Sequence, residues 1–257
     1  SNQTRHLEAQ EVQMFDICIA MPSVGIPEII VPTIYSIAEH IDPSLKTCIS
    51  VSMSKTDKSD PQEIYRQLAP LEGKFSIEIE FYEDEGGFAK NSNRALNKHI
   101  QLHGKPKYVL FLNSDVRPTK GWLQKMVAAF STDKVQSSTG NPAPYDASLY
   151  GRIGIVGPRS NFVAGHQLVQ MPAAEVMPAD APDCDIVGHF GAELESAMKG
   201  VVCTTDFISG FAMMASWECV EDISYMDMDA NYHFFDEGYG RGGYEDNDVC
   251  VRANLGG

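Results

Sequence analysis

Basic residues are scarce in this sequence. Only 20 Lys and Arg face 35 Asp and Glu among 257 residues, which gives a formal net charge of −15. Proteins that bind nucleic acid through its backbone need a concentrated basic surface, so we expect no nucleic-acid partner. An acidic chain suits a site that collects a divalent cation, although solubility alone also accounts for such a charge.

Long apolar runs are also missing. No stretch reaches the ~18 apolar residues that a membrane-spanning helix needs, so we expect no transmembrane segment. Residues 1–14 are polar and lack the apolar core of a secretory signal peptide. We expect that segment to be disordered or derived from a tag. The expected location is cytoplasmic, with attachment at the inner face of a membrane left open for a lipid-linked acceptor.

Closely spaced cysteine pairs are absent as well. The six cysteines occupy positions 18, 48, 184, 203, 219 and 250, and none belongs to a CxxC pair. Cys18 and Cys48 lie inside apparent strands. This pattern predicts small buried apolar residues in a reducing compartment, rather than a disulfide framework or a zinc site.

Strand and helix signals alternate through the first half of the chain. The expected strands are 15–23, 46–54, 76–85 and 108–112, and the expected helices are 27–41, 60–71, 86–104 and 119–130. Such alternation with short connections predicts an α/β fold: a Rossmann-like, mostly parallel sheet with helices on both faces.

The pattern changes after residue 130. The expected order is a loop-like stretch, a strand with turns in 151–169, a helix at 188–200, one or two buried strands in 201–216, a helix at 217–223 and a Gly-rich loop leading into a helix. We therefore expect one domain over 15–257, with an alternating α/β half at 15–130 and a variable half at 131–257.

Two acidic clusters follow element boundaries. Asn113, Ser114 and Asp115 follow the apolar strand 108–112, and Glu245 and Asp246 open the last helix after four glycines. Ligands of open α/β sheets bind at the carboxyl ends of strands. One carboxylate there could hold a hard cation and another could act as a general base. Taken singly, each cluster is weak evidence, because an Asp after a strand is more often a turn or cap residue and acidic residues at a helix start can be caps alone.

An ordered set of segments gives these clusters a context. "AMPS", "GGFAKNSNRALN", "YVLFLNSDVRPTKGWL", "ISGFAMMASWECVEDI" and "FDEGYGRGGYEDNDVCVRA" follow one another from about residue 15 to the end. In order and spacing the chain resembles the family 2 glycosyltransferases, which have the GT-A fold. The resemblance implies an inverting enzyme that uses Mn²⁺ or Mg²⁺. It would move a sugar from a UDP- or dTDP-linked donor to a hydroxyl of a glycan or glycolipid, in surface polysaccharide or glycoconjugate synthesis.

The resemblance also implies roles for particular residues. The turn after the first strand, with Pro22 and Ser23, would hold the nucleotide base, helped by a residue among 52–57. Gly87 and Asn93 would line the nucleotide and its phosphates. The DxD motif falls on residues 113–115, where Asn113 and Ser114 would contact the donor and Asp115 would coordinate the metal. The acidic pair falls on Glu245 and Asp246, and Asp246 would be the catalytic base.

Two departures from the family pattern stand out. Asn113 occupies the first DxD position, so it brings an amide oxygen but no charge to a cation. The His that many relatives place downstream of the acidic pair has no counterpart here, and His233 is a poor substitute by position. We therefore expect the third metal ligand either to be absent or to lie outside this sequence, in a longer protein of which this chain would be one domain.

Two other functions remain open. A nucleotidyltransferase shares a similar sheet and a metal, but it would carry a Gly-rich basic loop after the first strand. "MPSVGIPEI" has one glycine and no base. A module of the same fold that binds nucleotide-sugar or glycan without turnover would account for Asn113 and for the missing His.

Overall fold

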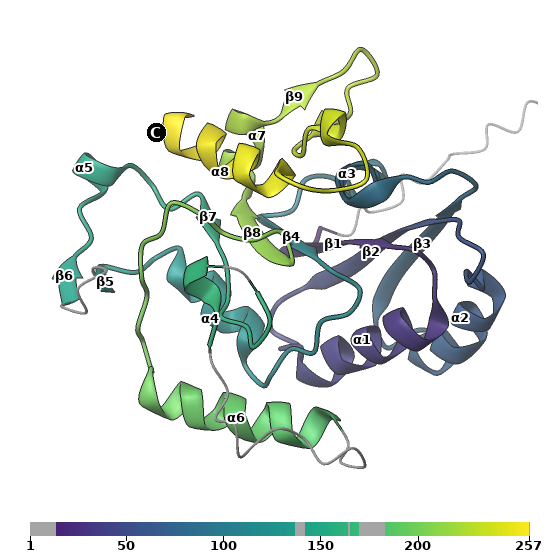
Figure 1. Ribbon diagram of the computed structural model, residues 1–257, viewed down its shortest axis with the longest axis horizontal. Coiled ribbons are helices and arrows are strands. Elements are labelled where there is room, and N and C mark those ends of the chain that lie inside the picture. Colours follow the sequence, from purple (N-terminus) through teal and green to yellow (C-terminus); the bar gives the residue numbers. More distant parts are fainter. Residues whose placement is uncertain (1–13, 137–141, 164, 170–182, 257) are drawn as a thin grey trace, which may run out of the picture.

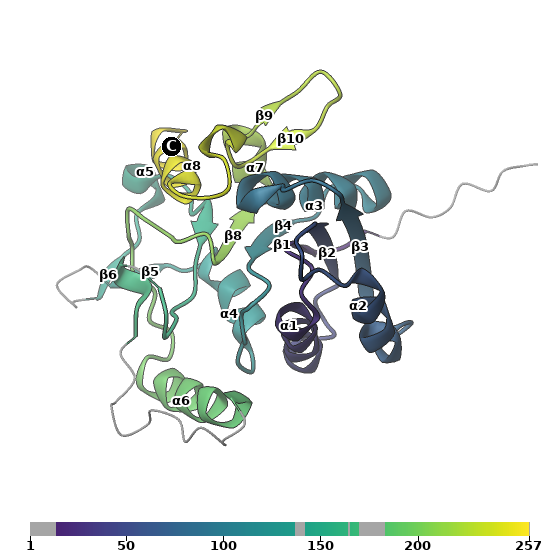
Figure 2. The ribbon, with the colours of Figure 1, turned by 45° about the vertical axis from the view of Figure 1, so that its right-hand side comes forward.

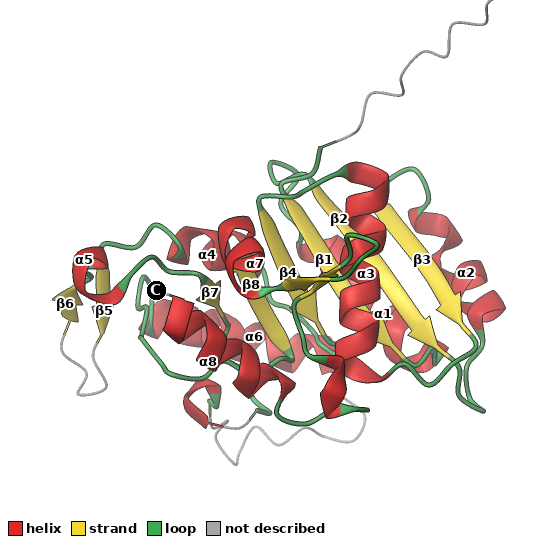
Figure 3. Cartoon of the chain, turned by 90° about the horizontal axis from the view of Figure 1, so that it is seen from above, coloured by secondary structure: helices red, strands yellow, loops and turns green. Residues whose placement is uncertain are grey.

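A six-stranded sheet forms the centre of the protein in the computed structural model, which describes residues 14–136, 142–163, 165–169 and 183–256. The strand order is β3-β2-β1-β4-β8-β7, and Figure 3 shows the sheet with α3 lying across it. The strands are β1 (Ile17–Ser23), β2 (Thr47–Ser54), β3 (Ser76–Tyr82), β4 (Tyr108–Leu112), β7 (Ile155–Val156) and β8 (Ala212–Ser216).

The first four strands are parallel, with β1 between β2 and β4. β8 runs antiparallel to β4, and Leu112 pairs with Ala212. Every residue of β1 and β2 is buried, as expected for parallel strands covered on both faces. The predicted α/β architecture is therefore confirmed, with one reversed strand supplied by the second half of the chain.

Helices cover both faces of this sheet (Figures 1 and 2). One face packs against α1 (Pro27–His40), α2 (Pro61–Leu68) and α4 (Trp122–Ala129), and the other lies under α3 (Gly87–His103), α7 (Trp217–Ile223) and α8 (Glu245–Gly256). Alternate residues of β1 divide between the two cores. Ile17 and Ile19 face the first core, and Cys18 and Ala20 face the second, as the two-residue period of a strand requires.

Helix boundaries follow local chemistry. Asp60 caps α2 as predicted, because its Oδ1 accepts a hydrogen bond from the N–H of Glu63 at 3.0 Å. The predicted helix at 119–130 begins only at Trp122, since the preceding Gly121 has a left-handed φ of 73°. The predicted helix 60–71 is α2 followed by a 3₁₀ turn at Ala69–Leu71.

The second half differs more from the sequence-based expectation. The stretch expected to be a loop contains β5 (Lys134–Gln136), β6 (Pro142–Pro144) and α5 (Ala147–Tyr150). Among the described residues of 151–169, the helical and strand elements are β7 and a 3₁₀ turn at Gly165–Gln167, and 201–216 holds the single strand β8. α6 (Asp183–Ala197) begins earlier than expected. A hairpin of β9 (Tyr225–Met226) and β10 (Tyr232–His233) had no clear sequence signal.

The interpretation of the N-terminal segment as disordered or tag-derived falls on residues 1–14, of which 1–13 lie outside the described residues. Among the helices that the structure describes, none combines the length and the apolar character that crossing a membrane requires.

Candidate active site

The carboxyl edge of the sheet collects the predicted donor-site residues. Pro22 and Ser23 are the last two residues of β1 and are buried. The Oγ of Ser23 accepts a hydrogen bond from the N–H of Gly25 at 3.1 Å. This contact shapes the turn that leads from β1 into α1, so Ser23 acts on the backbone of that turn.

Residues 113–115 follow β4 at the same edge. Thr33 on α1 anchors them: its buried Oγ1 donates to the C=O of Ser114 at 2.7 Å and accepts from Arg117 at 2.6 Å. The side chain of Asp115 is exposed, and none of the described residues hydrogen-bonds or ion-pairs with its carboxylate. A fixed backbone therefore presents an acid whose oxygens are all available to a ligand.

Two short contacts bring the second acidic cluster to this edge. The N–H of Asn113 donates to the C=O of Phe211 at 2.8 Å, which extends the pairing of β4 with β8 by one step. Gly210, which precedes Phe211, donates its N–H to Oδ2 of Asp246 at 3.0 Å. A Cβ at Gly210 would lie 3.0 Å from the ring of Phe88. The segments 113–115, 210–211 and 245–246, far apart in sequence, thus meet at one place.

Glu245 and Asp246 have different surroundings at the start of α8. Glu245 is buried, and its carboxylate accepts a hydrogen bond from the N–H of Gly243. Asp246 is partly exposed, and its Oδ1 accepts from the N–H of Asn247 at 2.9 Å. Oδ1 also accepts from the side-chain amide of Asn247 at 3.4 Å. Oδ2, whose one donor is the N–H of Gly210, therefore keeps a lone pair for another partner.

The Gly-rich segment before α8 lies against the start of α3. The N–H of Phe88 donates to the C=O of Arg241 at 3.1 Å, and Arg241 forms an ion pair with Glu85. Gly87 has a φ of 70°, and a Cβ built on it would lie only 2.8 Å from the Cα of Arg241. Two features require glycine at position 87: the left-handed backbone conformation and the close approach of Arg241.

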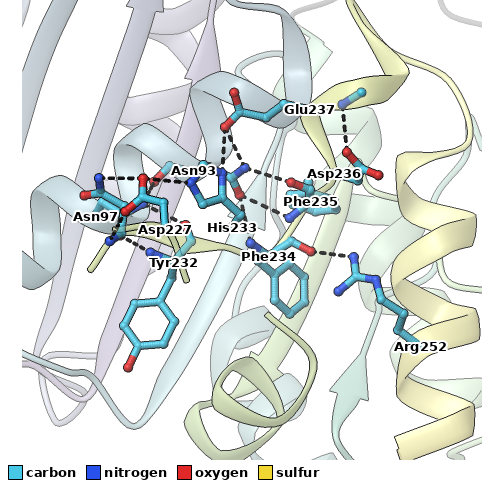
Figure 4. Close-up of polar contacts among 12 residues, drawn as sticks. Asn93, Asn97, Asp227, Tyr232, His233, Phe234, Phe235, Asp236, Glu237 and Arg252 are labelled. Carbon is cyan, nitrogen blue, oxygen red and sulfur yellow. Dashed lines mark hydrogen bonds and ion pairs between the residues drawn. The ribbon is translucent and has the colours of Figure 1, made fainter. Parts of the chain in front are cut away.

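The side chain of Asn93 is buried in the core and is not exposed at the carboxyl edge of the sheet. Its carboxamide oxygen accepts from the N–H groups of Phe234 and Phe235, both at 3.1 Å, and its nitrogen donates to the C=O of Phe235 at 2.8 Å and to Glu237 at 3.0 Å (Figure 4). Since both ends of the amide are engaged, this side chain positions the segment 234–237 and has no free group for a nucleotide.

A second buried polar cluster was not anticipated from the sequence. Ser52 and Ser54, at the end of β2, donate to Oδ1 of Asn91 at 3.0 and 3.1 Å, and the N–H of Gly86 donates to Ser54 at 2.8 Å. These contacts tie the end of β2 to the start of α3. The serines at alternate positions of β2, Ser50, Ser52 and Ser54, were the available signal.

His233 lies on the β9–β10 hairpin. Its Nε2 is 3.2 Å from Asp227 and its Nδ1 is 3.2 Å from Glu237, and Tyr225 stacks on its ring at 4.5 Å. Figure 4 shows His233 among these hairpin and loop residues, beside the asparagines of α3. Its close contacts are therefore with other residues of the hairpin and the following loop.

The residues at the carboxyl edge fit a hard cation. The free carboxylate of Asp115 and the partly exposed amide of Asn113 offer oxygen atoms, which Mg²⁺ and Mn²⁺ prefer. Such ions commonly use one or two carboxylates together with substrate phosphates. A site of this composition needs a phosphate-bearing ligand to complete the coordination.

A mostly parallel sheet with an acid after a central strand and a second acid on a helix beside it defines a GT-A type of α/β protein. The sequence pattern of Glycosyl transferase family 2 matches residues 18–155, more than half of the chain. The chain therefore belongs to glycosyl transferase family 2.

The chain is similar to several solved structures, and the likeness to GalNAc-T7 shows the fold. GalNAc-T7 in complex with UDP, GalNAc and Mn²⁺ has a TM-score of 0.51 at 12% identity, over 93% of this chain and 40% of that one. TarS of S. aureus in complex with UDP has a TM-score of 0.47 at 16% identity, over 94% and 55%. The mannosyltransferase PcManGT of Pyrobaculum calidifontis with GDP-Man and Mn²⁺ has 0.48 at 15%, over 86% and 50%.

These likenesses concern the fold alone, and the chain spans about half the length of the first solved structures that it matches. A comparison with curated protein sequences gave no significant match.

Proposed function

We propose that this chain is a metal-dependent inverting glycosyltransferase that moves a sugar from a nucleoside-diphosphate-sugar to an acceptor hydroxyl. One observation carries the proposal. The free carboxylate of Asp115 and the partly exposed carboxylate of Asp246 are held at one edge of the sheet by the Asn113–Phe211 and Gly210–Asp246 contacts. One acid can then serve the donor diphosphate and the other the acceptor.

Asp115, with the amide oxygen of Asn113, would hold Mn²⁺ or Mg²⁺ against the donor diphosphate. When bound, such a cation offsets the negative charge that develops on a departing diphosphate. Thr33 keeps the backbone of Ser114 in place, so the acid is presented without a large rearrangement.

Asp246 would take the proton from the attacking acceptor hydroxyl. Its two oxygens are oriented by the N–H groups of Gly210 and Asn247, and the N-terminus of α8 favours a negative charge there. Attack on the anomeric carbon from the face opposite the diphosphate forms the new glycosidic bond as the old bond breaks, which inverts the configuration. Buried Glu245, through Gly243, would position the glycine segment instead of exchanging protons.

The remaining donor contacts are assigned to the turn after β1 and to the start of α3. Pro22 and Ser23 would flank the nucleotide base, and Ser114 and Gly87 would border the sugar and phosphates. Asn93 would act indirectly, by holding the segment 234–237. The donor is proposed to be UDP- or dTDP-linked, and the acceptor a glycan or glycolipid of surface polysaccharide or glycoconjugate synthesis, met in the cytoplasm or at the inner face of a membrane.

The test is a donor screen with this chain and Mn²⁺. A thermal shift with each nucleotide-sugar identifies the best binder, beginning with UDP-sugars because GalNAc-T7 holds UDP and Mn²⁺. Release of the nucleoside diphosphate is then measured with a panel of glycan acceptors, and NMR of the product gives the anomeric configuration. Release with inversion supports the proposal, and retention of configuration contradicts the mechanism.

Two other outcomes would support the alternatives. Binding of a nucleotide-sugar with neither hydrolysis nor transfer on any acceptor would indicate an inert binding module. Release of pyrophosphate from a nucleoside triphosphate and a sugar phosphate would indicate a nucleotidyltransferase.

A further inference from the structure

A cysteine and two histidines meet at the opposite, amino edge of the sheet. Cys48 is the second residue of β2, and His99 and His103 lie in the last two turns of α3. One potential ligand atom from each of the three lies within 4.8 Å of the other two. α3 begins at the carboxyl edge and ends at the amino edge, so this cluster is at the far end of the helix from Gly87.

His99 is the unusual member of this cluster. Its side chain is 0% exposed, and neither ring nitrogen has a hydrogen-bond partner among the described residues. The nearby helix carbonyl of Ala95 already accepts from Ser50 at 2.7 Å. A buried polar group without a partner destabilises the fold, and such groups are rare enough to require an explanation.

The surroundings resemble those of a metal-bound imidazole pair. Residues i and i+4 of a helix project from the same face, so His99 and His103 can bind one ion together. The ring of Phe15 packs edge-on against both imidazoles, at centroid distances of 5.7 and 4.9 Å. Nε2 of His103 lies 3.4 Å from Glu78 on β3, and a carboxylate beside a metal-bound histidine fixes the orientation of its ring.

The spacing is also suitable. Around a tetrahedral zinc ion with bonds of about 2.0–2.3 Å, ligand atoms lie roughly 3.3–3.6 Å apart. The ligand atoms of the three side chains lie within 4.8 Å of one another, so they would have to move closer by roughly 1 Å to bind zinc. Side-chain rotation can supply this movement. Two imidazoles and a thiol form a nitrogen and sulfur set, which selects Zn²⁺ over the hard Mg²⁺ and Mn²⁺.

We propose that Cys48, His99 and His103 bind a zinc ion that clamps the end of α3 to the start of β2, with Glu78 orienting His103. The proposal revises the sequence-based interpretation of Cys48 as merely a small buried apolar residue. It does not depend on the proposed glycosyl transfer, because Asp115 and Asp246 lie at the other edge of the sheet. A clamp at this end would stabilise the helix that carries Asn91 and Asn93.

The experiment uses the purified chain after treatment with a chelator. Co²⁺ is titrated as a spectroscopic probe, and Zn²⁺ is then added in competition. We expect a sulfur-to-cobalt charge-transfer band that saturates at one equivalent and disappears with Zn²⁺, together with a higher thermal midpoint in Zn²⁺. Absence of the band in the folded wild-type chain would overturn the proposal.

Matched variants locate the site. Cys48→Ala should abolish the band, whereas Cys18→Ala should keep it, although Cys18 is the register partner of Cys48 on the neighbouring strand and is also buried. Asp115→Ala should also keep it, which separates this site from the proposed donor-site cation. Glu78→Gln should keep the band but weaken zinc affinity by about 10–100-fold.

Circular dichroism checks that each variant is folded. If Cys48→Ala does not fold, His103→Gln decides, because the side chain of His103 is partly exposed and its loss disturbs less of the core. A band that survives in folded Cys48→Ala or His103→Gln at unchanged affinity would refute the assignment.

Discussion

The carboxamide of Asn93 pairs with Phe235 as a neighbouring strand would: it donates to the C=O of Phe235 at 2.8 Å and accepts from its N–H at 3.1 Å. Asn97, one turn later, pairs in the same way with Tyr232, at 2.8 and 2.7 Å. Two side chains of α3 therefore substitute for a missing strand beside the segment 232–235. This segment leads to the Gly-rich loop and to Asp246.

Replacing Asn93 should destabilise the protein strongly. Asn93→Ala leaves the buried N–H and C=O groups of Phe235 without partners, and we expect a loss of about 2–4 kcal/mol in the free energy of unfolding. Urea denaturation measures the loss. The control, Asn161→Ala, removes an exposed loop amide and should stay within about 0.5 kcal/mol of wild type. Equal stability of the two variants would mean that the pairing contributes little.

Asp246→Asn should separate chemistry from binding. The amide oxygen of asparagine can still accept from Gly210, so the fold is retained, but the side chain no longer takes up a proton. We expect kcat to fall by at least ~10²-fold, with donor affinity nearly unchanged, measured by nucleoside diphosphate release and by calorimetry. Asp229→Asn, on the exposed hairpin, is the control. Normal turnover of Asp246→Asn would exclude this residue as the base.

Substitutions of Asp115 and of Asn113 should change the affinity for Mn²⁺ in opposite directions. Asp115→Ala removes the free carboxylate, so UDP should no longer bind more tightly in Mn²⁺ than in a chelator. Asn113→Asp adds a second negative charge at the same place and should tighten Mn²⁺ binding by on the order of tenfold. Calorimetric titration of Mn²⁺ in the presence of UDP measures both. Unchanged Mn²⁺ dependence in Asp115→Ala would place the cation elsewhere.

A comparison of two glycines tests the contact between α3 and the Gly-rich segment. Gly73 and Gly87 have similar φ values of 73° and 70°, but a Cβ at Gly73 meets nothing within 4 Å. Alanine at either position costs about 1–2 kcal/mol for the left-handed backbone. At Gly87 we expect about 1–3 kcal/mol more from the clash with Arg241. Thermal denaturation provides the comparison, and equal losses would show that residues 240–243 move aside freely.

Acid should destabilise the metal-free protein partly through His99. Burial, with a smaller contribution from the charge of His103, lowers the pKa of His99 to about 4. The thiol of Cys48 lies close to its ring, and Glu78 contacts His103. In the unfolded chain the pKa is about 6.5. As the pH falls from 6.5 towards 4, only the unfolded chain gains this proton, so the free energy of unfolding decreases, by about 2 kcal/mol at pH 5.

The measurement is urea denaturation at pH 7 and pH 5 in a chelator. Both wild type and His99→Gln lose stability in acid through their carboxylates, but the loss should be about 2 kcal/mol smaller in the variant. Identical losses would show that His99 is protonated in the folded protein.

The sequence by itself was sufficient for the alternation of strands and helices up to residue 130, because each element there has a strong local signal. β1 is a nearly continuous apolar run, apolar residues alternate with serines along β2, and Asp60 followed by proline marks the start of α2. The order of the motifs also indicated the family. The hairpin of β9 and β10 could not be predicted, since its two-residue strands carry no periodicity and are held by Asn97 from a distant helix.

The tertiary structure alone decided which polar side chains are free. In the sequence, Asn93 and Asp115 look equally suited to bind a ligand. In the structure, residues of the segment 234–237 hydrogen-bond to the amide of Asn93, whereas none of the described residues hydrogen-bonds to the carboxylate of Asp115. Likewise Cys48 has no metal-binding neighbour along the chain, and only the packing of α3 on β2 brings His99 and His103 to it. Hydrogen-bond partners and metal ligands depend on distances between segments remote in sequence, which only the folded chain sets.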